Sequence, residues 1–313
     1  MQNKTSAVVI LGTGGTIAGT AARPGDNVGY SAAQLGVAQL VAALPALARV
    51  RIEAEQVAQI DSKDMGFAVW RQLAERVMHH LARPDVKGVV ITHGTDTLEE
   101  TAYFLQRVLA PRKPVVLAAA MRPATSLQAD GPQNLLDAVT LAQLDDASGV
   151  LAVLAGQVHS ALEVRKQHPY RLDAFGSGDA GVLGCMEEGV LRRHRPWPQG
   201  KALGLNHLPA DTEHWPRVEV IVSHAGASGT LVRALCSDGV QGIVVAGTGN
   251  GSLHHLLEVA LLEAQAVGVR VWRSTRCGNG AVLATANDAL PGAGALTPVQ
   301  ARIALMLDLC KTG

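Results

Sequence analysis

Gly88-Val-Val-Ile-Thr-His-Gly-Thr-Asp-Thr-Leu-Glu-Glu100 is the segment around which the predicted fold is built. Its apolar run 88–91 is typical of a strand that is buried on both faces. Thr97 stands where a helix would begin, with two carboxylates in the first turn. Residues 92–96 follow the strand at its carboxyl end, the edge at which open α/β sheets bind ligands. A hydroxyl next to a carboxylate at this edge can hold a small polar substrate.

Strands and helices alternate along most of the chain. Strands are predicted at 7–11, 50–60, 114–121, 149–155, 218–223, 242–246 and 269–273, and helices at 33–47, 64–82, 131–144 and from Thr297 onward. This alternation indicates an α/β fold with a mainly parallel sheet and right-handed crossovers. The helical pattern lapses over 157–191.

The predicted domains follow from a change in composition. Residues 194–215 are rich in Pro, Trp and His and are interpreted as a linker. We therefore predict a larger N-terminal domain at 1–193, with a mainly parallel sheet flanked by helices. A smaller C-terminal α/β domain, also with a parallel sheet, is predicted at 216–313.

Composition excludes several classes of partner. The chain has 313 residues, a formal net charge of +0 and 48% hydrophobic residues. This length is sufficient for one large core or for two separate cores. A neutral charge balance argues against nucleic acid or an anionic membrane as the main partner.

Neither a disulfide framework nor a zinc site is expected. The four cysteines are widely scattered and form no C-x-x-C pair. The first six residues lack an apolar leader, and no apolar run approaches the length of a membrane span. We expect a cytoplasmic protein, although a periplasmic protein without its leader would look the same.

The first glycine-rich loop is Gly12-Thr-Gly-Gly-Thr16, directly after the strand at 7–11. A dinucleotide-binding turn would need glycine where Ile17 stands, and no P-loop motif is present. Three interpretations remain open from the residues alone: a structural turn, a phosphate loop, and a turn that projects the Thr16 hydroxyl into a cleft as a nucleophile.

The pair Thr95-Asp96 is the second candidate for chemistry. Threonine is a poor nucleophile until a base takes its proton, and a lysine such as Lys166 can be that base. A neighbouring carboxylate opposes this role, so Asp96 suits an ammonium clamp or a lysine-positioning group better. The alternative for Lys166 is an ordinary solvated surface lysine.

Other catalytic signatures are missing. No G-x-S-x-G elbow is present, and the histidine pairs at 79–80 and 254–255 lack H-E-x-x-H spacing. We therefore expect no catalytic metal and no cofactor.

Taken together, the motifs resemble a known family. Gly12-Thr-Gly-Gly-Thr-Ile-Ala-Gly19 and Ile91-Thr-His-Gly-Thr-Asp-Thr-Leu-Glu-Glu100 are similar to the two signature motifs of the bacterial-type L-asparaginases and glutaminase-asparaginases. The resemblance continues, in the right order, through 120–123, 129–132, 247–251 and 273–276. It implies hydrolysis of the side-chain amide of L-asparagine to L-aspartate and ammonia through an acyl-enzyme on threonine.

The resemblance also assigns roles to residues of this chain. Thr16 matches the nucleophile, and Tyr30 matches a lid tyrosine that activates or positions it. Thr95, Asp96 and Lys166 match a second set that activates the attacking water or the second threonine. The substrate-binding positions implied are Gly15, Ser62, Lys63, Thr95, Asp96, Ala120, Asn250 and Asp288, with Ser62 gripping the α-carboxylate and Asp96 the α-ammonium. Backbone N–H groups near Gly15 and Thr95 would form the oxyanion hole.

Assembly is implied in the same way. The family forms a homotetramer of close dimers whose sites lie between subunits, and Asn250 with an acidic residue would approach the neighbour's substrate. Asp288 is the candidate acid, within a stretch that looks shortened. Lys63 departs from the glutamine or glutamate of many relatives, which predicts altered affinity and a weaker glutaminase side activity.

Three alternatives to an L-asparaginase remain open. The nearest is a balanced glutaminase-asparaginase. A non-catalytic amino-acid sensor on the same scaffold could bind through Asp96 and Ser62 without turnover. A nucleotide-dependent enzyme would need the phosphate-loop interpretation of the first glycine-rich loop.

Overall fold

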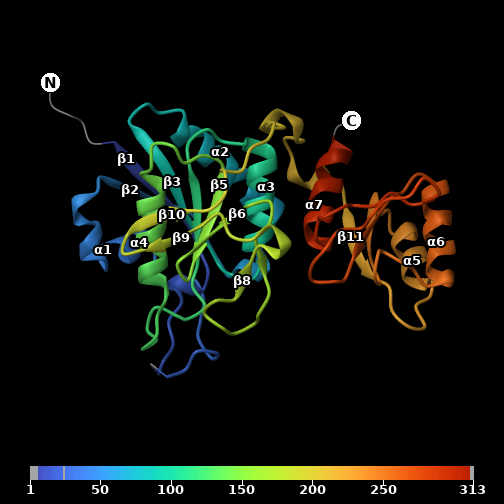
Figure 1. Cartoon of the computed structure of the whole chain (residues 1–313), viewed down its shortest axis with the longest axis horizontal. Coiled ribbons are helices and arrows are strands. Elements are labelled where there is room, and N and C mark those ends of the chain that lie inside the picture. Colours follow the sequence, from blue (N-terminus) through green and yellow to red (C-terminus); the bar gives the residue numbers. More distant parts are fainter. Residues whose placement is uncertain (1–5, 24, 311–313) are drawn as a thin grey trace. The chain divides into compact units, whose positions relative to one another are not determined.

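The computed structural model describes residues 6–23 and 25–310. Residues 1–5, for which no apolar leader is expected, lie outside the described residues. The chain divides into two compact units, 1–205 and 206–313. In Figure 1 the first unit is coloured from blue to yellow and the second from gold to red.

The first unit is built on an eight-stranded sheet with the order β10-β9-β6-β5-β4-β3-β1-β2. Five neighbouring strands are parallel: β1 (Ala7–Gly14), β2 (Ile52–Ile60), β3 (Val86–Thr92), β4 (Val115–Ala118) and β5 (Val150–Leu154). The segment without helical pattern supplies three antiparallel strands, β6 (Gln157–Ser160), β9 (Gly184–Glu187) and β10 (Val190–Arg193). The predicted mainly parallel sheet is therefore confirmed.

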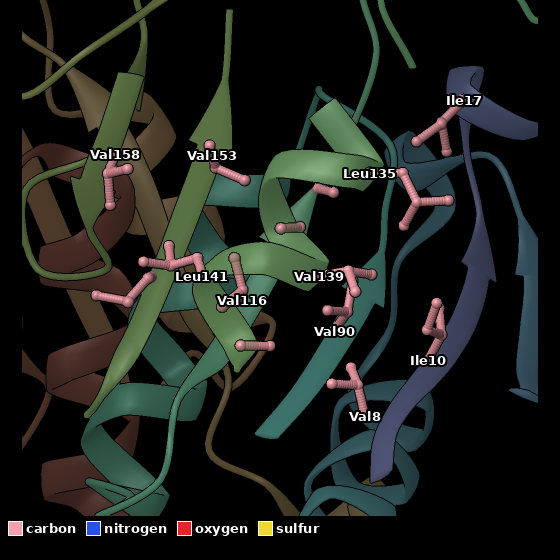
Figure 2. Packing of buried hydrophobic residues seen from close by; sticks show 14 of the residues in the cluster. Val8, Ile10, Ile17, Val90, Val116, Leu135, Val139, Leu141, Val153 and Val158 are labelled. Carbon is pink, nitrogen blue, oxygen red and sulfur yellow. The ribbon is translucent and has the colours of Figure 1, made fainter. Parts of the chain in front are cut away.

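Helices cover both faces of this sheet. On one face, α4 (Gly131–Ala142) packs over the central strands, and Figure 2 shows Leu135 and Val139 directed toward Val90 and Ile10. On the other face, α2 (Phe67–Leu81) and α3 (Leu98–Leu109) pack against the strands and against each other. Every residue of β1 is buried as a result, which explains its unbroken apolar run.

One predicted helix is wrong. Residues 33–47 carry an apolar stripe, but the structure has only the short α1 (Val37–Ala42) and a separate 3₁₀ turn at Pro45–Arg49. Proline has no N–H to continue the helix, and it disfavours helical backbone at the preceding residue. Ala33 has a φ of 55°, which also keeps it outside a right-handed helix.

The second unit has a three-stranded parallel sheet with the order β11-β12-β13. Its strands are β11 (Val218–Val222), β12 (Gly242–Gly247) and β13 (Arg270–Thr275), and its helices are α5 (Thr230–Ser237), α6 (His255–Ala266) and α7 (Pro298–Leu309). As predicted, Thr297 caps α7, and its hydroxyl accepts the N–H of Gln300. Across the described parts of both units, no helix is long and apolar enough to cross a bilayer.

Candidate active site

Three neighbouring strands, β2, β1 and β3, end at the same edge of the first sheet, and the candidate residues lie directly after them. Two glycines bring the loops after these strands into contact. A Cβ atom on Gly15 would lie 2.3 Å from the backbone Cα and N of Gly94. A Cβ atom on Gly94 would lie 2.3 Å from the Oγ of Ser62. Only residues without side chains permit this approach.

The first glycine-rich loop therefore lies in close contact with the backbone of the loop that carries Gly94. Gly14 and Gly15 have φ values of 102° and 80°, a region that favours glycine. The Gly15 N–H donates to the carbonyl of Ile60 at 2.9 Å. This bond removes the Gly15 N–H from the predicted oxyanion hole, and it also takes away a donor that a phosphate loop would use.

Thr16 begins a short 3₁₀ turn that follows this loop, and its side chain is buried. Its Oγ1 lies 2.7 Å from the phenolic oxygen of Tyr30. Tyr30 is carried back to Thr16 by the 20–31 loop, whose ends are joined because Thr20 and Ser31 exchange two backbone hydrogen bonds of 2.9 Å. The predicted neighbours Thr16 and Tyr30 are thus in direct contact.

Lys166 reaches the second threonine. It lies on the two-residue strand β7 (Arg165–Lys166), which pairs with β8 (Phe175–Gly176) apart from the large sheet. The Nζ of Lys166 is 2.8 Å from the Thr95 Oγ1 and 2.6 Å from the Asp96 Oδ1. A charged amine at this position donates to both oxygens, whereas a neutral amine can accept the Thr95 proton.

Ser62 connects the loop after β2, on which it lies, with the loop after β3. The Asp96 N–H donates to the Ser62 Oγ at 3.2 Å, and the Thr97 hydroxyl donates to the Ser62 carbonyl at 2.7 Å. Thr97 occupies the N-cap position of α3 as predicted, but its side chain makes this bond instead of capping the helix. The Ser62 hydroxyl accepts from Asp96 and retains its own proton for donation.

Ala120 follows β4 and is fully buried. The two residues after it are held by Asp130, whose carboxylate accepts the N–H groups of Met121 and Arg122 at 2.9 Å each.

Lys63 follows Ser62, but its side chain contacts two acidic residues of its own loop. Its amine pairs with Asp61 at 2.8 Å and Asp64 at 3.3 Å, and its side chain is 62% exposed.

Asn250 and Asp288 belong to the second unit. Asn250 holds Leu283 by two bonds, since its Oδ1 accepts the Leu283 N–H at 2.7 Å and its Nδ2 donates to the carbonyl at 3.1 Å. Asp288 pairs with Arg273 at 2.5 Å and accepts from the N–H and hydroxyl of Thr285. Both predicted residues therefore make contacts within their own unit.

Sequence reasoning gave no role to His93, which connects the loop after β3 to α3. Its Nδ1 lies 2.7 Å from the Gly94 carbonyl and its Nε2 2.9 Å from the Thr101 hydroxyl, to which Trp70 also donates. Complete burial lowers the pKa of His93 to about 4, so the ring is neutral. A neutral ring has one N–H, which the Gly94 carbonyl accepts, and the Thr101 hydroxyl donates to the other nitrogen.

The fold and this site define a class of protein: an α/β protein with two buried threonines, each with a polar partner, on adjoining loops at the carboxyl edge of a parallel sheet. Such hydroxyl–partner pairs suit nucleophilic catalysis. Within the described ranges, no three His, Cys, Asp or Glu side chains gather as metal ligands do.

Family models place the chain within this class. Residues 7–198 match the N-terminal domain of asparaginase, and residues 217–313 match the glutaminase/asparaginase C-terminal domain. The chain belongs to the asparaginase family.

Individual relatives are similar over nearly the whole chain. L-asparaginase 2 of Bacillus subtilis is 38% identical, with 97% of this chain and 82% of the relative covered. Glutaminase-asparaginase of Pseudomonas fluorescens is also 38% identical, with 99% and 88% covered. A crystal structure of a probable cytoplasmic L-asparaginase from Campylobacter jejuni superposes with a TM-score of 0.93 at 38% identity, and 98% of this chain and 96% of that chain are covered.

Proposed function

We propose that this chain is an L-asparaginase, which hydrolyses the side-chain amide of L-asparagine to L-aspartate and ammonia. The observation that carries the proposal is the contact of Gly15 with Gly94, which brings the loops of Thr16 and Thr95 together. Each threonine already has a polar partner, Tyr30 for the first and Lys166 for the second. Two partnered hydroxyls on adjoining loops suit attack on an amide followed by hydrolysis of an ester.

Thr16 is the proposed nucleophile. Its oxygen attacks the amide carbon and gives up its proton, which leaves with the amide nitrogen as ammonia. The product of this step is an ester of aspartate on Thr16. Tyr30, at 2.7 Å from the attacking oxygen, orients the hydroxyl and relays its proton: the phenolic oxygen takes the Thr16 proton while its own proton passes to the departing amide nitrogen.

The second set carries the proposed hydrolysis of the ester. Lys166, which Asp96 holds in place, contacts the Thr95 hydroxyl; the hydroxyl passes its proton to the neutral lysine amine and takes one from a water molecule. Water adds to the ester carbon, the Thr16 oxygen leaves and regains a proton, and L-aspartate is released. The backbone N–H of Thr95 is also proposed as a donor to the substrate's carbonyl oxygen, which becomes negative during the attack.

Substrate binding follows from charge. The Asp96 side chain is 52% exposed, so its carboxylate can face an incoming α-ammonium group. Ser62 retains a hydroxyl proton that can be donated to the α-carboxylate. A zwitterion held at both ends places its side-chain amide at a fixed distance from the two loops, which favours one substrate length.

Assembly and location form a further part of the proposal. We propose a homotetramer of close dimers in the cytoplasm, in which Asn250 and Asp288 of one subunit complete the site of another. The cytoplasmic location is supported by the similarity to the Campylobacter jejuni structure. For Asp288 to take this role, one of its oxygens must serve the neighbour's substrate in addition to Arg273 and Thr285.

The second candidate is a dual glutaminase-asparaginase, because a relative with that name is as similar as the asparaginases. Ammonia release from L-asparagine and L-glutamine, measured across concentrations, distinguishes the candidates. An L-asparaginase releases ammonia mainly from asparagine, and a dual enzyme releases it from both at comparable kcat/KM. Absence of ammonia from either amide, together with a thermal shift on adding asparagine, would instead show a sensor.

A further inference from the structure

Glu99 lies in the first turn of α3, three residues after Asp96, and contacts Lys166 from a second direction. Its Oε2 accepts the backbone N–H of Lys166 at 2.7 Å. The lysine amine meanwhile reaches Thr95 and Asp96. One short segment, 95–99, therefore holds both ends of Lys166, the backbone through Glu99 and the amine through the second catalytic set.

The backbone bond matters because the strand that carries Lys166 is short. β7 has two residues, and its sheet contains only β7 and β8. A two-stranded pair of this length has little stability of its own. The carboxyl group of Glu99 ties this strand to the beginning of α3, a helix that packs against the large sheet and against α2.

We propose that Glu99 is a positioning residue for the reaction: by holding the Lys166 backbone, it sets the distance between the lysine amine and the Thr95 hydroxyl. The proposal rests on the function proposed above for Thr95 and Lys166. In this role Glu99 acts through the hydrogen bond that it accepts from the Lys166 backbone N–H, and its negative charge matters less.

The surroundings of Glu99 explain why its charge is secondary. Burial raises the pKa of this carboxyl to about 7, and the neighbouring Glu100 acts in the same direction. The Lys166 N–H bond and the positive charges of Arg165 and Lys166 act in the opposite direction. Near neutral pH the carboxyl is therefore neutral for much of the time, and a neutral amide of the same length is a fair substitute.

Two variants separate reach from charge. Glu99→Gln keeps the length and an acceptor oxygen but loses the charge, whereas Glu99→Asp keeps the charge and is one methylene shorter. Since small displacements of catalytic groups cost one to two orders of magnitude in rate, we expect Glu99→Asp and Glu99→Ala to lower kcat for asparagine by about tenfold or more, with KM within about twofold. Glu99→Gln should keep kcat within about threefold.

The matched control is Glu100→Gln, which removes a carboxylate from the same helix turn and should leave kcat unchanged. Thermal unfolding of each variant shows whether it is folded. If Glu99→Ala does not fold, the Gln and Asp variants decide, since both retain a polar group at the helix N-terminus.

Three results would overturn the proposal. The first is wild-type kcat in Glu99→Ala, and the second is an active Asp variant beside an inactive Gln variant, because charge would then dominate. The third is a rise in KM without a fall in kcat. An inactive wild-type protein would remove the proposed function and this inference together, whereas an active wild type with an unimpaired Ala variant removes this inference alone.

Discussion

The Oγ1 of Thr16 and the phenolic oxygen of Tyr30 lie 2.7 Å apart, although the two residues sit on separate segments of the chain. Removing either oxygen tests whether this pair performs chemistry. Tyr30→Phe should lower kcat by about 100-fold or more, the range of a lost proton-transfer partner, with KM within about twofold. Thr16→Ala should remain folded and lose nearly all turnover.

Steady-state kinetics with asparagine checks this prediction, and Tyr170→Phe is the control, because Tyr170 is 47% exposed and bonds Arg122 through its backbone carbonyl. If Tyr30→Phe raises KM and leaves kcat intact, Tyr30 binds substrate and takes no part in the proton transfer.

The second prediction concerns Thr95 and Lys166, whose side chains are 2.8 Å apart. Thr95→Ala and Lys166→Met should each lower kcat at least about 100-fold, since each removes a group from the proposed proton path. Both variants should unfold within a few degrees of wild type, because neither residue lies in the apolar core. Thr95→Ser keeps the hydroxyl and should retain much of the rate. A Thr95→Ala variant with most of its activity would refute the assignment of the second set.

Gly15 provides a test of how the site is built. A Cβ atom there meets the backbone of Gly94 at 2.3 Å, and the φ of 80° strains any other residue. Gly15→Ala should therefore lower the thermal midpoint clearly and abolish most activity. Gly25→Ala is the control, because among the described residues, its chain neighbours aside, no atom lies within 4 Å of a Cβ built on Gly25. Equal stability of the two variants would mean that the loops do not meet at Gly15.

Much of this architecture could be predicted from the sequence, for a physical reason. A central strand covered on both faces needs an unbroken apolar run, and 7–11 and 88–91 show one. The failed helix at 33–47 has a helical stripe, but Pro45 and the left-handed Ala33 prevent its continuation.

The site was predicted less completely. The threonines stand in recognisable motifs, but Lys166 lies 71 residues from Thr95, and only the resemblance connected them. The roles of His93 and Glu99 were missed because they depend on contacts with the Gly94 carbonyl and the Lys166 N–H. No periodicity or spacing in the sequence records such backbone bonds.

Acid should weaken the fold through His93. Burial lowers its pKa to about 4, so between pH 6.5 and 4 the unfolded chain binds a proton that the folded protein does not. Stability is therefore lost as pH falls through this window, by about 2 kcal/mol between pH 7 and 5 from this ring. Glu99, whose pKa is raised to about 7, contributes with the opposite sign, so the net change is smaller.

A comparison with His93→Gln isolates this contribution. Between pH 7 and 5, the free energy of unfolding of the variant should fall by about 2 kcal/mol less than that of wild type. Denaturant unfolding at both pH values gives the two differences. Parallel pH profiles would show that His93 does not titrate differently in the folded and unfolded states.

Lys63 should influence the choice of substrate. Its amine is held by Asp61 and Asp64, and it directly follows Ser62, the residue proposed to hold the α-carboxylate. In Lys63→Gln the ratio of kcat/KM for glutamine to that for asparagine should rise several-fold, because the charge that pairs with Asp61 and Asp64 beside Ser62 is removed. Lys201→Gln, at an exposed position, is the control. An unchanged ratio contradicts the prediction.

The proposed mechanism requires Thr16 and Thr95 to act on the same carbon. The direct measurement is a crystal structure of the protein with L-aspartate, the product, bound at the site. We expect the β-carboxylate carbon between the two threonine hydroxyls, the α-ammonium on Asp96 and the α-carboxylate on Ser62. Aspartate bound elsewhere, or hydroxyls of Thr16 and Thr95 that face separate cavities, would contradict the account.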